Sequence, residues 1–409
     1  MSAVADVEAI RACFPALARV HNGHLVAYFD GPGGTQVPLA VAQAMTDYLL
    51  HHNANKGWVY PGSRETEAAI GAARVALADW VGGAPDEIVF GASMTTLTFH
   101  LARALGRAWR PGDVVVVTEQ DHHANSDTWR ALAEERGVEV RTVRMRGADG
   151  SLDEDDLQRK LTAGTRLFAF SAASNALGTV NDVPRLVALA HAAGALAFVD
   201  AVHYAGHHAP DARAWGCDFL ACSAYKFYGP HLGVLWGRRE LLEALDAPRL
   251  EPAKASAPER IETGTLSHEG VVGAAAAIDF LAALAPDGPP RRTRLLQVVE
   301  VLHARSQGLL ERLWHGLGEI AGVTRYGLPP QAPRTSTLSF TLEGHDSAGV
   351  AAALADRGVF VSHGHFYALD LARALGRDRD GFVRAGCVAY TTAEEVERLL
   401  DGVRALAGP

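Results

Sequence analysis

Between about residues 86 and 240, short apolar runs rich in β-branched residues alternate with longer Ala- and Leu-rich segments that have helical periodicity. This alternation predicts βαβ units, in which crossover helices cover both faces of a mostly parallel sheet. Strands covered on both faces are expected to be short and continuously apolar. The expected strands are 114–117, 138–143, 167–170, 195–199, 219–222 and 233–236. Helices are expected between them at 127–136 and 183–193, so the sequence predicts an α/β fold.

A second, smaller unit is expected after the helix-breaking run Ala-Pro-Asp-Gly-Pro-Pro at 285–290. Its pattern is α+β, and its last helix opens with the capping-box pattern Thr392-x-x-Glu395. The other expected elements are strands 336–342, 359–362 and 382–389 and helix 348–357. We therefore predict three parts, namely an N-terminal segment 1–30, a large domain 31–285 and a small C-terminal domain 286–409.

Charge and cysteine content narrow the classes of function. The chain carries 38 Lys and Arg against 47 Asp and Glu, a net charge of -9, without basic clusters, so we expect no nucleic-acid partner. No apolar run reaches the roughly 18 residues of a membrane span, so we expect no membrane insertion. The first 20 residues do not resemble a secretory signal, and the four cysteines form no CxxC pair. These features predict a cytoplasmic protein with reduced thiols and a small-molecule substrate.

Polar residues follow several of the expected strands. Because parallel strands of one sheet end at a common edge, where open α/β sheets bind ligands, these side chains are expected to share a crevice. They include His122, Asn175, Asp200, His203 and Lys226. An imidazole, an amide, a carboxylate and an amine in one crevice indicate a catalytic site.

Lys226 and Asp200 together indicate pyridoxal phosphate (PLP). Lys226 is one of four lysines in the chain and lies between apolar and aromatic residues, where burial would favour its neutral, nucleophilic form. A lysine binds the PLP aldehyde as a Schiff base, and an aspartate keeps the pyridine nitrogen protonated. Taken singly, each residue has an alternative reading, a surface lysine at a strand end and a capping or ion-paired carboxylate.

A phosphate site is expected at 91–96, Gly-Ala-Ser-Met-Thr-Thr, ahead of the helical pattern at 97–105. Backbone NH groups at a helix N-terminus bind phosphate, although the same residues also suit a plain helix cap. The chain has neither GxGxxG nor a Walker lysine motif, so nucleotide cofactors are not expected.

At this point the chain resembles a known family. From about Phe29 to the final helix it is similar to the class V aminotransferase and cysteine desulfurase family of fold-type I PLP enzymes. The segments that carry the resemblance are 121–125, 174–179, 200–203, 223–230 and 262–265. It implies a fold-type I PLP-dependent transferase with a large, mostly parallel domain and a smaller α+β domain. It also implies PLP as cofactor, an amino-acid substrate, and a homodimer with the active site at the subunit interface.

The resemblance assigns the catalytic centre. Lys226 matches the Schiff-base lysine, Asp200 the partner of the pyridine nitrogen, and His122 the imidazole stacked on the cofactor ring. Asn175 matches the amide near the ring hydroxyl and the substrate carboxylate. His203 stands where the family commonly has Gln, and either side chain can donate a hydrogen bond to the ring hydroxyl.

The phosphate end of the cofactor is assigned in the same way. Met94 and Thr95 match the phosphate loop, and Ser223 matches a phosphate ligand. Tyr225 replaces the usual His, and its hydroxyl is still expected to reach the phosphate. Thr265 matches the residue that reaches the phosphate from the second subunit.

Arg384 matches the arginine that binds the substrate carboxylate, a task suited to its bidentate guanidinium. A surface arginine on an edge strand is the alternative. Desulfurases carry a nucleophilic cysteine on the loop that corresponds to 363–368, but here this loop reads His-Gly-His-Phe-Tyr-Ala. The sulfur acceptor of a desulfurase is therefore missing from its expected position.

Aromatic residues are candidates for a substrate pocket. Phe366 and Tyr367 on this loop, together with Trp58 and Tyr60, are expected to line a site for a large substituent, with ordinary packing as the alternative. The two loop histidines lack nearby carboxylates or thiols, so no metal site is expected. The paired histidines His51-His52 and His207-His208 are expected to be solvated.

The leading functional hypothesis is a PLP-dependent carbon–sulfur β-lyase that cleaves an S-substituted cysteine conjugate. It needs α-proton abstraction by Lys226 and a thiolate leaving group, which departs without an enzyme nucleophile. The alternatives are a PLP-dependent aminotransferase, an epimerase or a decarboxylating deaminase. A cysteine desulfurase or a catalytically dead homologue is less favoured.

Overall fold

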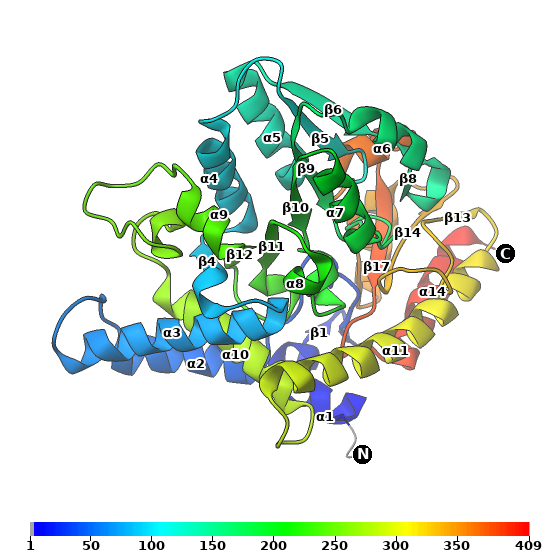
Figure 1. Cartoon of the computed structure of the whole chain (residues 1–409). Coiled ribbons are helices and arrows are strands. Elements are labelled where there is room, and N and C mark those ends of the chain that lie inside the picture. The colour runs from blue at the N-terminus through cyan, green and yellow to red at the C-terminus, as the bar shows by residue number, and fades with distance from the viewer. Residues whose placement is uncertain (1–3, 409) are drawn as a thin grey trace.

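The computed structural model describes residues 4–408, and its centre is a seven-stranded sheet with the strand order β4-β12-β11-β10-β9-β5-β6 (Figure 1). Neighbouring strands are parallel from β6 to β11, while β12 is antiparallel to both β11 and β4. The predicted α/β fold with a mostly parallel sheet is confirmed. The strands are β4 (Ile88–Gly91), β5 (Val114–Thr118), β6 (Glu139–Val143), β9 (Thr165–Ser171), β10 (Leu196–Asp200), β11 (Phe219–Ser223) and β12 (Gly233–Gly237).

Both faces of this sheet are buried, as the continuous apolar runs predicted. Alternate residues of a strand point to opposite faces, so Leu167 and Ala169 of β9 lie in a different core cluster from Phe168 and Phe170. The first cluster includes residues of α4 (Met94–Gly106) and α5 (His123–Arg136). The second includes residues of α3 (Pro61–Val81), α7 (Val183–Ala192) and α10 (His268–Ala283).

Two helices begin earlier than expected, and both begin at the carboxyl edge of the sheet. Helix α4 starts at Met94 because the Ser93 side chain accepts a hydrogen bond from Thr96 N and so caps the helix. Helix α5 starts at His123 because His122 caps it, with its ring nitrogen accepting from Ala124 N. Histidine is an unusual helix cap, and the start predicted from the sequence, residue 127, is therefore four residues later than the observed start at His123.

The C-terminal part forms a four-stranded sheet with the order β13-β14-β17-β16. The expected strand 359–362 is divided between two sheets, because β15 pairs with β3 near the N-terminus and β16 pairs with β17. The expected strand 382–389 ends at Gly386, where the next amide, Cys387 N, bonds to Ser336 O. The elements are β3 (Ala27–Tyr28), β13 (Val323–Tyr326), β14 (Thr337–Leu342), β15 (Val359–Phe360), β16 (Ser362–Gly364), β17 (Phe382–Gly386), α11 (Arg291–Gly318), α12 (Ser347–Asp356), α13 (Leu369–Ala374) and α14 (Ala393–Ala407).

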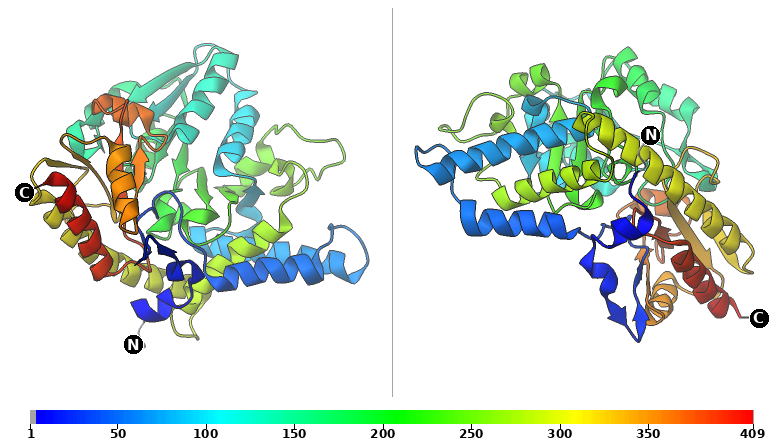
Figure 2. Two further views of the ribbon diagram at one scale, coloured as in Figure 1. Left: turned by 180° about the vertical axis from the view of Figure 1, so that it is seen from behind. Right: turned by 90° about the horizontal axis from the view of Figure 1, so that it is seen from below.

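Helices α2 (Leu39–Asp47), α3 and α10 pack together, and the tip that joins α2 to α3 projects from the body of the molecule (Figure 2). The predicted domain boundary at 285 lies in the link between α10 and α11. The remaining elements are α1 (Val7–Arg11), β1 (Val20–His21), β2 (His24–Leu25), β7 (Met145–Arg146), β8 (Ser151–Leu152), α6 (Glu154–Lys160), α8 (Ala212–Trp215) and α9 (Arg239–Ala244).

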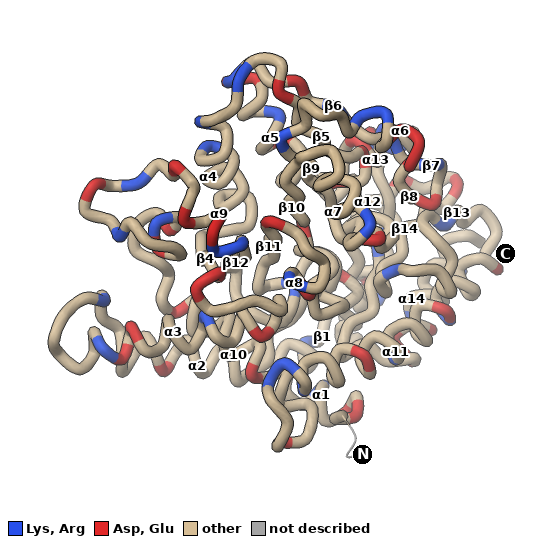
Figure 3. Tube along the Cα trace, in the orientation of Figure 1, with Lys and Arg blue, Asp and Glu red and all other residues tan. Residues whose placement is uncertain are grey.

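Acidic and basic residues are interspersed along the surface elements rather than gathered by sign (Figure 3). Many of them pair with each other, as Arg239 does with Asp86 and Arg312 with Glu397. Within residues 4–408, no helix is both long and apolar enough to cross a bilayer.

Gly233 is the point where strand β12 meets the first turn of helix α4. A Cβ there would lie 2.2 Å from Ser93 C and 2.6 Å from Met94 N, which are backbone atoms that cannot rotate away. We expect Gly233→Ala to lower the free energy of unfolding by about 1–3 kcal/mol, the usual cost of overpacking. Chemical denaturation monitored by circular dichroism measures this change.

Gly71 provides the matched control, because it lies inside α3 with no heavy atom within 4 Å of the position that an added Cβ would take. Gly71→Ala is expected to stabilise the protein by about 0.5–1 kcal/mol, since alanine is the better helix former. Equal effects of the two replacements would contradict the close approach of β12 to α4.

Candidate active site

A cavity of about 620 Å³ lies at the carboxyl edge of the large sheet, within the range of small-molecule sites. Strands β9, β10 and β11 and the first turns of α4 and α5 form its floor, and β17 and the loop before α13 contribute side chains from the smaller unit. The structure brings together twelve of the residues that the sequence singled out. They are Met94, Thr95, His122, Asn175, Asp200, His203, Ser223, Tyr225, Lys226, Phe366, Tyr367 and Arg384.

Three aromatic or hydroxyl candidates lie elsewhere. Thr265 is exposed in the segment before α10 and does not line the cavity of its own chain. Trp58 and Tyr60, which are 53% and 46% exposed, stack on each other at the tip between α2 and α3. The expectation that they line the cavity with Phe366 and Tyr367 is therefore wrong for the single chain, because the α2–α3 tip extends away from the sheet edge.

Lys226 ends the short turn that follows β11, and only 8% of it is exposed. Its amine donates hydrogen bonds to the carbonyl oxygens of Pro32 and, at 3.1 Å, Gly33. The pKa of this amine is lowered to about 7, chiefly by burial and with a smaller contribution from the nearby Arg384 guanidinium. Near neutral pH a substantial fraction of the amine is therefore in its neutral, nucleophilic form.

Asp200 ends β10 and is also buried, with Val202 N donating to its Oδ1 at 2.9 Å. The pKa of Asp200 is raised to about 7, chiefly by burial; the Asp121 carboxylate acts in the same direction, and the hydrogen bond from Val202 N opposes it. Sequence reasoning did not assign a role to Asp121, although it follows β5 directly. This buried residue accepts hydrogen bonds from Ser171 N and Oγ at 2.8 and 2.7 Å, so it fixes the edge beside Asp200.

His122 caps helix α5 and faces the cavity. Its Nδ1 accepts a hydrogen bond from Ala124 N at 3.0 Å, so the ring proton lies on Nε2. The pKa of His122 is lowered to about 4, chiefly by burial and with a smaller contribution from the neighbouring Lys226. The ring of Tyr367 stacks on His122 with a centroid distance of 5.3 Å and an interplanar angle of 25°. A neutral, flat imidazole suits a stacking role.

A phosphate group fits the end of the cavity near helix α4. Met94 and Thr95 form the first turn of this 13-residue helix, where backbone NH groups lack intrahelical partners and the helix dipole favours an anion. Ser223 and Tyr225 line the same cavity from the end of β11. Their hydroxyls supply further hydrogen-bond donors.

Arg384 on β17 is 4% exposed and lines the opposite part of the cavity. Its Nη1 donates to Asn175 O at 2.7 Å, but its buried Nε has no hydrogen-bond partner among residues 4–408. Burial lowers the pKa of Arg384 to about 9, against the opposing influence of Asp30. Asp30, which the sequence did not single out, is half-buried with an enclosed Oδ1, and desolvation raises its pKa to about 6. The free donor edge of Arg384 suits a substrate carboxylate.

The loop before α13 holds two aromatic residues over the cavity. The ring of Phe366 lies 3.9 Å from the Arg384 guanidinium, a cation–π contact. Phe366 and Tyr367 have φ values of 55° and 59°, a left-handed conformation that is costly for bulky residues. Their carbonyl oxygens accept hydrogen bonds from Asn175 Nδ2 at 2.9 Å and His123 N at 2.8 Å, which hold the loop in place.

The cysteines lie away from this site. Cys217, Cys222 and Cys387 are buried, and burial raises the pKa of each thiol, for Cys387 to about 12. All four cysteines lie within the described residues 4–408, and none of them lines the cavity. The same range contains no group of three or more His, Cys, Asp or Glu side chains placed to hold a metal ion.

The cavity fits PLP in its chemistry. A neutral amine suits the aldehyde, and a buried carboxylate with a raised pKa suits a protonated ring nitrogen. The turn at α4 suits the phosphate, and Arg384 retains a donor edge for the carboxylate of an amino acid. PLP together with an amino acid would supply hydrogen-bond partners for buried polar atoms, such as Arg384 Nε, that have no partner among residues 4–408.

Comparison with known proteins identifies the family. A family model described as Aminotransferase class-V matches residues 27–399. A cysteine desulfurase of Pectobacterium carotovorum subsp. carotovorum is 32% identical over 97% of both chains. A probable cysteine desulfurase 2 of Mycobacterium leprae is 35% identical over 97% of this chain and 96% of its own.

Among solved structures, an apo cysteine desulfurase from Thermococcus onnurineus NA1 superposes with a TM-score of 0.89 at 29% identity, covering 100% of this chain and 99% of its own. The expected fold-type I architecture and PLP cofactor are thereby confirmed. The chain belongs to the class V aminotransferase family of PLP-dependent enzymes.

Proposed function

We propose that the enzyme is a carbon–sulfur β-lyase that acts on an S-substituted cysteine. In this reaction the α-proton is removed, the Cβ–S bond breaks, and the sulfur leaves with the bonding electrons as a thiolate. Water then converts the remaining fragment to pyruvate and ammonium. The sulfur needs no acceptor on the enzyme, because a thiolate is a stable leaving group.

The main support for this proposal is that no cysteine of the described chain lines the cavity. A desulfurase that takes sulfur from free cysteine needs a nucleophile beside the substrate sulfur. The corresponding loop here presents Phe366 and Tyr367 instead. The remaining machinery suits a reaction that requires only a base and a good leaving group.

Lys226 and Arg384 supply the base and the anchor. Bound PLP would withdraw electrons from the α-carbon of the amino acid. With a pKa near 7, the Lys226 amine can accept the α-proton and return it at neutral pH. Arg384 would bind the carboxylate through its free Nε edge, and Asn175 O already fixes the guanidinium plane.

The sulfur substituent would lie against aromatic surface. Phe366 packs on Arg384, Tyr367 packs on His122, and Phe99 of α4 also lines the cavity. Flat apolar walls favour an apolar or aromatic substituent over free cysteine, whose thiol would leave this surface uncovered.

The relatives named cysteine desulfurases favour a second candidate, sulfur release from free cysteine. The two reactions differ in their products. Desulfuration gives alanine and transferable sulfur, whereas β-elimination gives pyruvate, ammonium and a thiol. Transamination, epimerisation or oxidative deamination would give neither set.

We also propose that the enzyme is a homodimer. The tip between α2 and α3 exposes large apolar side chains, among them Leu50 (71%) and Val59 (88%). Contiguous exposed apolar surface of this kind commonly marks a protein interface. Thr265, exposed in its own chain, would then reach the phosphate of the partner's cofactor.

The first prediction compares substrates. Holoenzyme supplied with S-methyl, S-allyl and S-benzyl cysteine is expected to form pyruvate and thiol in equal amounts, with the benzyl conjugate preferred. Arg384→Leu should lower kcat/KM by about 10²-fold, since it removes the buried partner of the carboxylate. Lactate dehydrogenase coupling and a thiol reagent measure the two products.

Single Cys→Ala replacements at all four cysteines provide the control, and none should reduce thiol formation, because no thiol takes part. Alanine and sulfide from free cysteine, without pyruvate from any conjugate, would instead identify a desulfurase.

The second prediction concerns the pH dependence of cofactor loading. Because burial depresses the pKa of Lys226 to about 7, its neutral, reactive fraction is small at pH 6 and nearly complete at pH 8. The rate at which apoenzyme gains the visible absorption of bound PLP should therefore rise through pH 7 and then level off. Arg384→Leu removes a positive charge that lowers the Lys226 pKa, so the midpoint should move to higher pH.

Lys226→Ala should show no such absorption at any pH. A midpoint near the ordinary lysine value of about 10.4 would contradict the buried environment of this amine.

The third prediction concerns assembly. Wild-type enzyme should have twice the mass of one chain by light scattering, and Val59→Asp should shift it toward the monomer with weaker PLP binding. Val301→Asp is the control, since Val301 is 43% exposed on α11, away from the α2–α3 tip. A monomeric wild type that still binds PLP tightly would exclude the shared site.

A further inference from the structure

Histidines form a row that leads away from the active-site cavity. The expectation that His207 and His208 are solvated is wrong, because the turn after β10 carries both rings beneath α11. Burial lowers the pKa of each to about 3. Both rings are therefore neutral in the folded protein, and a neutral imidazole has one donor and one acceptor nitrogen.

The first link joins His203 to His207 through a threonine. His203 lines the active-site cavity, and its Nε2 lies between two hydroxyls, 3.0 Å from Thr335 Oγ1 and 3.2 Å from Thr337 Oγ1. The Thr337 hydroxyl lies 3.5 Å from Nε2 of His207. The ring centroids of the two histidines are 5.0 Å apart. Since a hydroxyl donates and accepts, Thr337 connects the two imidazoles.

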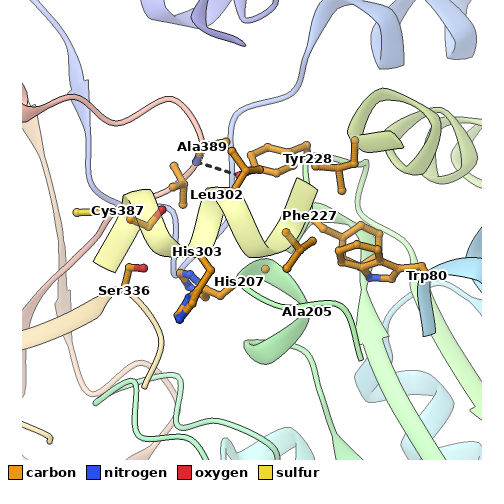
Figure 4. A pocket seen from close by; sticks show the side chains of 15 residues that line it. Trp80, Ala205, His207, Phe227, Tyr228, Leu302, His303, Ser336, Cys387 and Ala389 are labelled. Atoms are coloured by element: carbon orange, nitrogen blue, oxygen red, sulfur yellow. Dashed lines mark hydrogen bonds between the residues drawn. The ribbon is translucent and has the colours of Figure 1, made fainter. Parts of the chain in front are cut away.

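The second link is a small cavity of about 30 Å³ between the two units of the chain. Figure 4 shows His303 of α11 close to His207, with Ser336 beside them and apolar side chains on the remaining sides. Ser336 Oγ and His303 Nδ1 are buried without a hydrogen-bond partner in the part of the chain that the structure covers. The cavity has room for one water, and its lining includes the polar side chains of His207, His303, Ser306 and Ser336, so a buried water would find the partners that it requires.

The third link is His303 itself. Gln307 Nε2 donates to Arg334 O at 2.7 Å, which fixes the orientation of its amide, and it lies 3.5 Å from His303 Nε2. His303 Nε2 therefore accepts, and its proton lies on Nδ1, toward the small cavity. His303 also lines a second hollow of about 370 Å³, whose wall includes the exposed Gln331. The row thus ends at the protein surface.

We propose that His203, Thr337, His207, one water and His303 form a proton path between the active-site cavity and solvent. His303 Nε2 takes a proton from a solvent molecule that displaces its 3.5 Å contact with Gln307 Nε2, and this gain is balanced by the proton that Nδ1 gives to the water. The water passes one proton to His207, His207 Nε2 passes one to Thr337, and Thr337 passes one to His203 Nε2. His203 then releases its Nδ1 proton to the cavity, so one proton enters and one leaves.

This path supplies protons when a bound substrate fills the mouth of the main cavity. Each ring changes tautomer and then reorients, and no group along the path carries a lasting charge. The proposal holds for any reaction of this cavity that moves a proton. The proton path can therefore be tested independently of whether the enzyme catalyses β-elimination.

The test compares identical replacements at neighbouring positions. His207→Phe interrupts the path, whereas His208→Phe keeps a ring that stacks on Tyr204 and His303 and forms no link of the path. Holoenzyme is first saturated with 3-phenylpropionate, whose carboxylate is expected to bind Arg384 and whose ring is expected to cover the cavity mouth. It is then moved rapidly from pH 6 to pH 8, and the visible absorption of the cofactor reports the arrival of the change.

We expect the absorbance change after the pH jump to be at least about tenfold slower in His207→Phe, because a proton-transfer group is lost. The rate should be unchanged in His208→Phe. In His303→Ala, added imidazole should enter the surface hollow and restore the wild-type rate. Equal relaxation in wild type and His207→Phe, or failure of imidazole to restore His303→Ala, would overturn the path.

A second measurement does not depend on variants or on activity. A crystal structure of the wild-type apoenzyme should show one ordered water within hydrogen-bond distance of Ser336 Oγ and His303 Nδ1. A dry cavity at a resolution where other buried waters are ordered would remove the second link and with it the proposal.

Discussion

The structure depends on the burial of three ionisable groups in one cavity without ion-pair partners. Lys226, Asp200 and Arg384 each have a pKa displaced toward the neutral form, with burial as the largest cause. None of them forms a salt bridge with another residue of the described chain. Such groups destabilise a folded protein unless a ligand completes them. The large two-sided core provides the stability that keeps them there, and PLP with its amino acid supplies the missing charges.

Topology explains why these groups meet. Asp200 and Lys226 follow neighbouring strands, β10 and β11, because parallel strands joined by crossover helices end at the same edge. Arg384 comes from a separate sheet and reaches the cavity only because the smaller unit packs across that edge. Its contact with Asn175 O joins the two units at the substrate position, so the distance from the amine to the carboxylate anchor depends on their packing.

Sequence patterns predict what local chemistry determines. Buried parallel strands were evident because they are continuously apolar, and Lys226 was evident because lysine is scarce in this chain and this one is flanked by apolar residues. Other features depend on tertiary contacts with no local signal. The sequence predicted solvated imidazoles at His207 and His208 because nothing local shows that α11 packs over them, and it gave no reason to single out Asp30. Strand 359–362 divides because the N-terminal strand β3 supplies an edge that no local pattern reveals.

The loop before α13 presents Phe366 and Tyr367 to the cavity and carries no thiol. A thiol that accepts sulfur from a substrate must afterwards deliver it elsewhere, so the segment that carries it has to move. Here Asn175 and His123 hold the carbonyl oxygens of Phe366 and Tyr367, and both aromatic residues occupy left-handed conformations that cost about 1–3 kcal/mol each. A strained conformation persists only where surrounding contacts stabilise it. The hydrogen bonds from Asn175 and His123 therefore indicate that the loop is held in a fixed position beside the cavity. A fixed aromatic wall without a thiol fits the proposed β-elimination, in which the sulfur leaves with its substituent, better than a reaction that requires a mobile sulfur carrier.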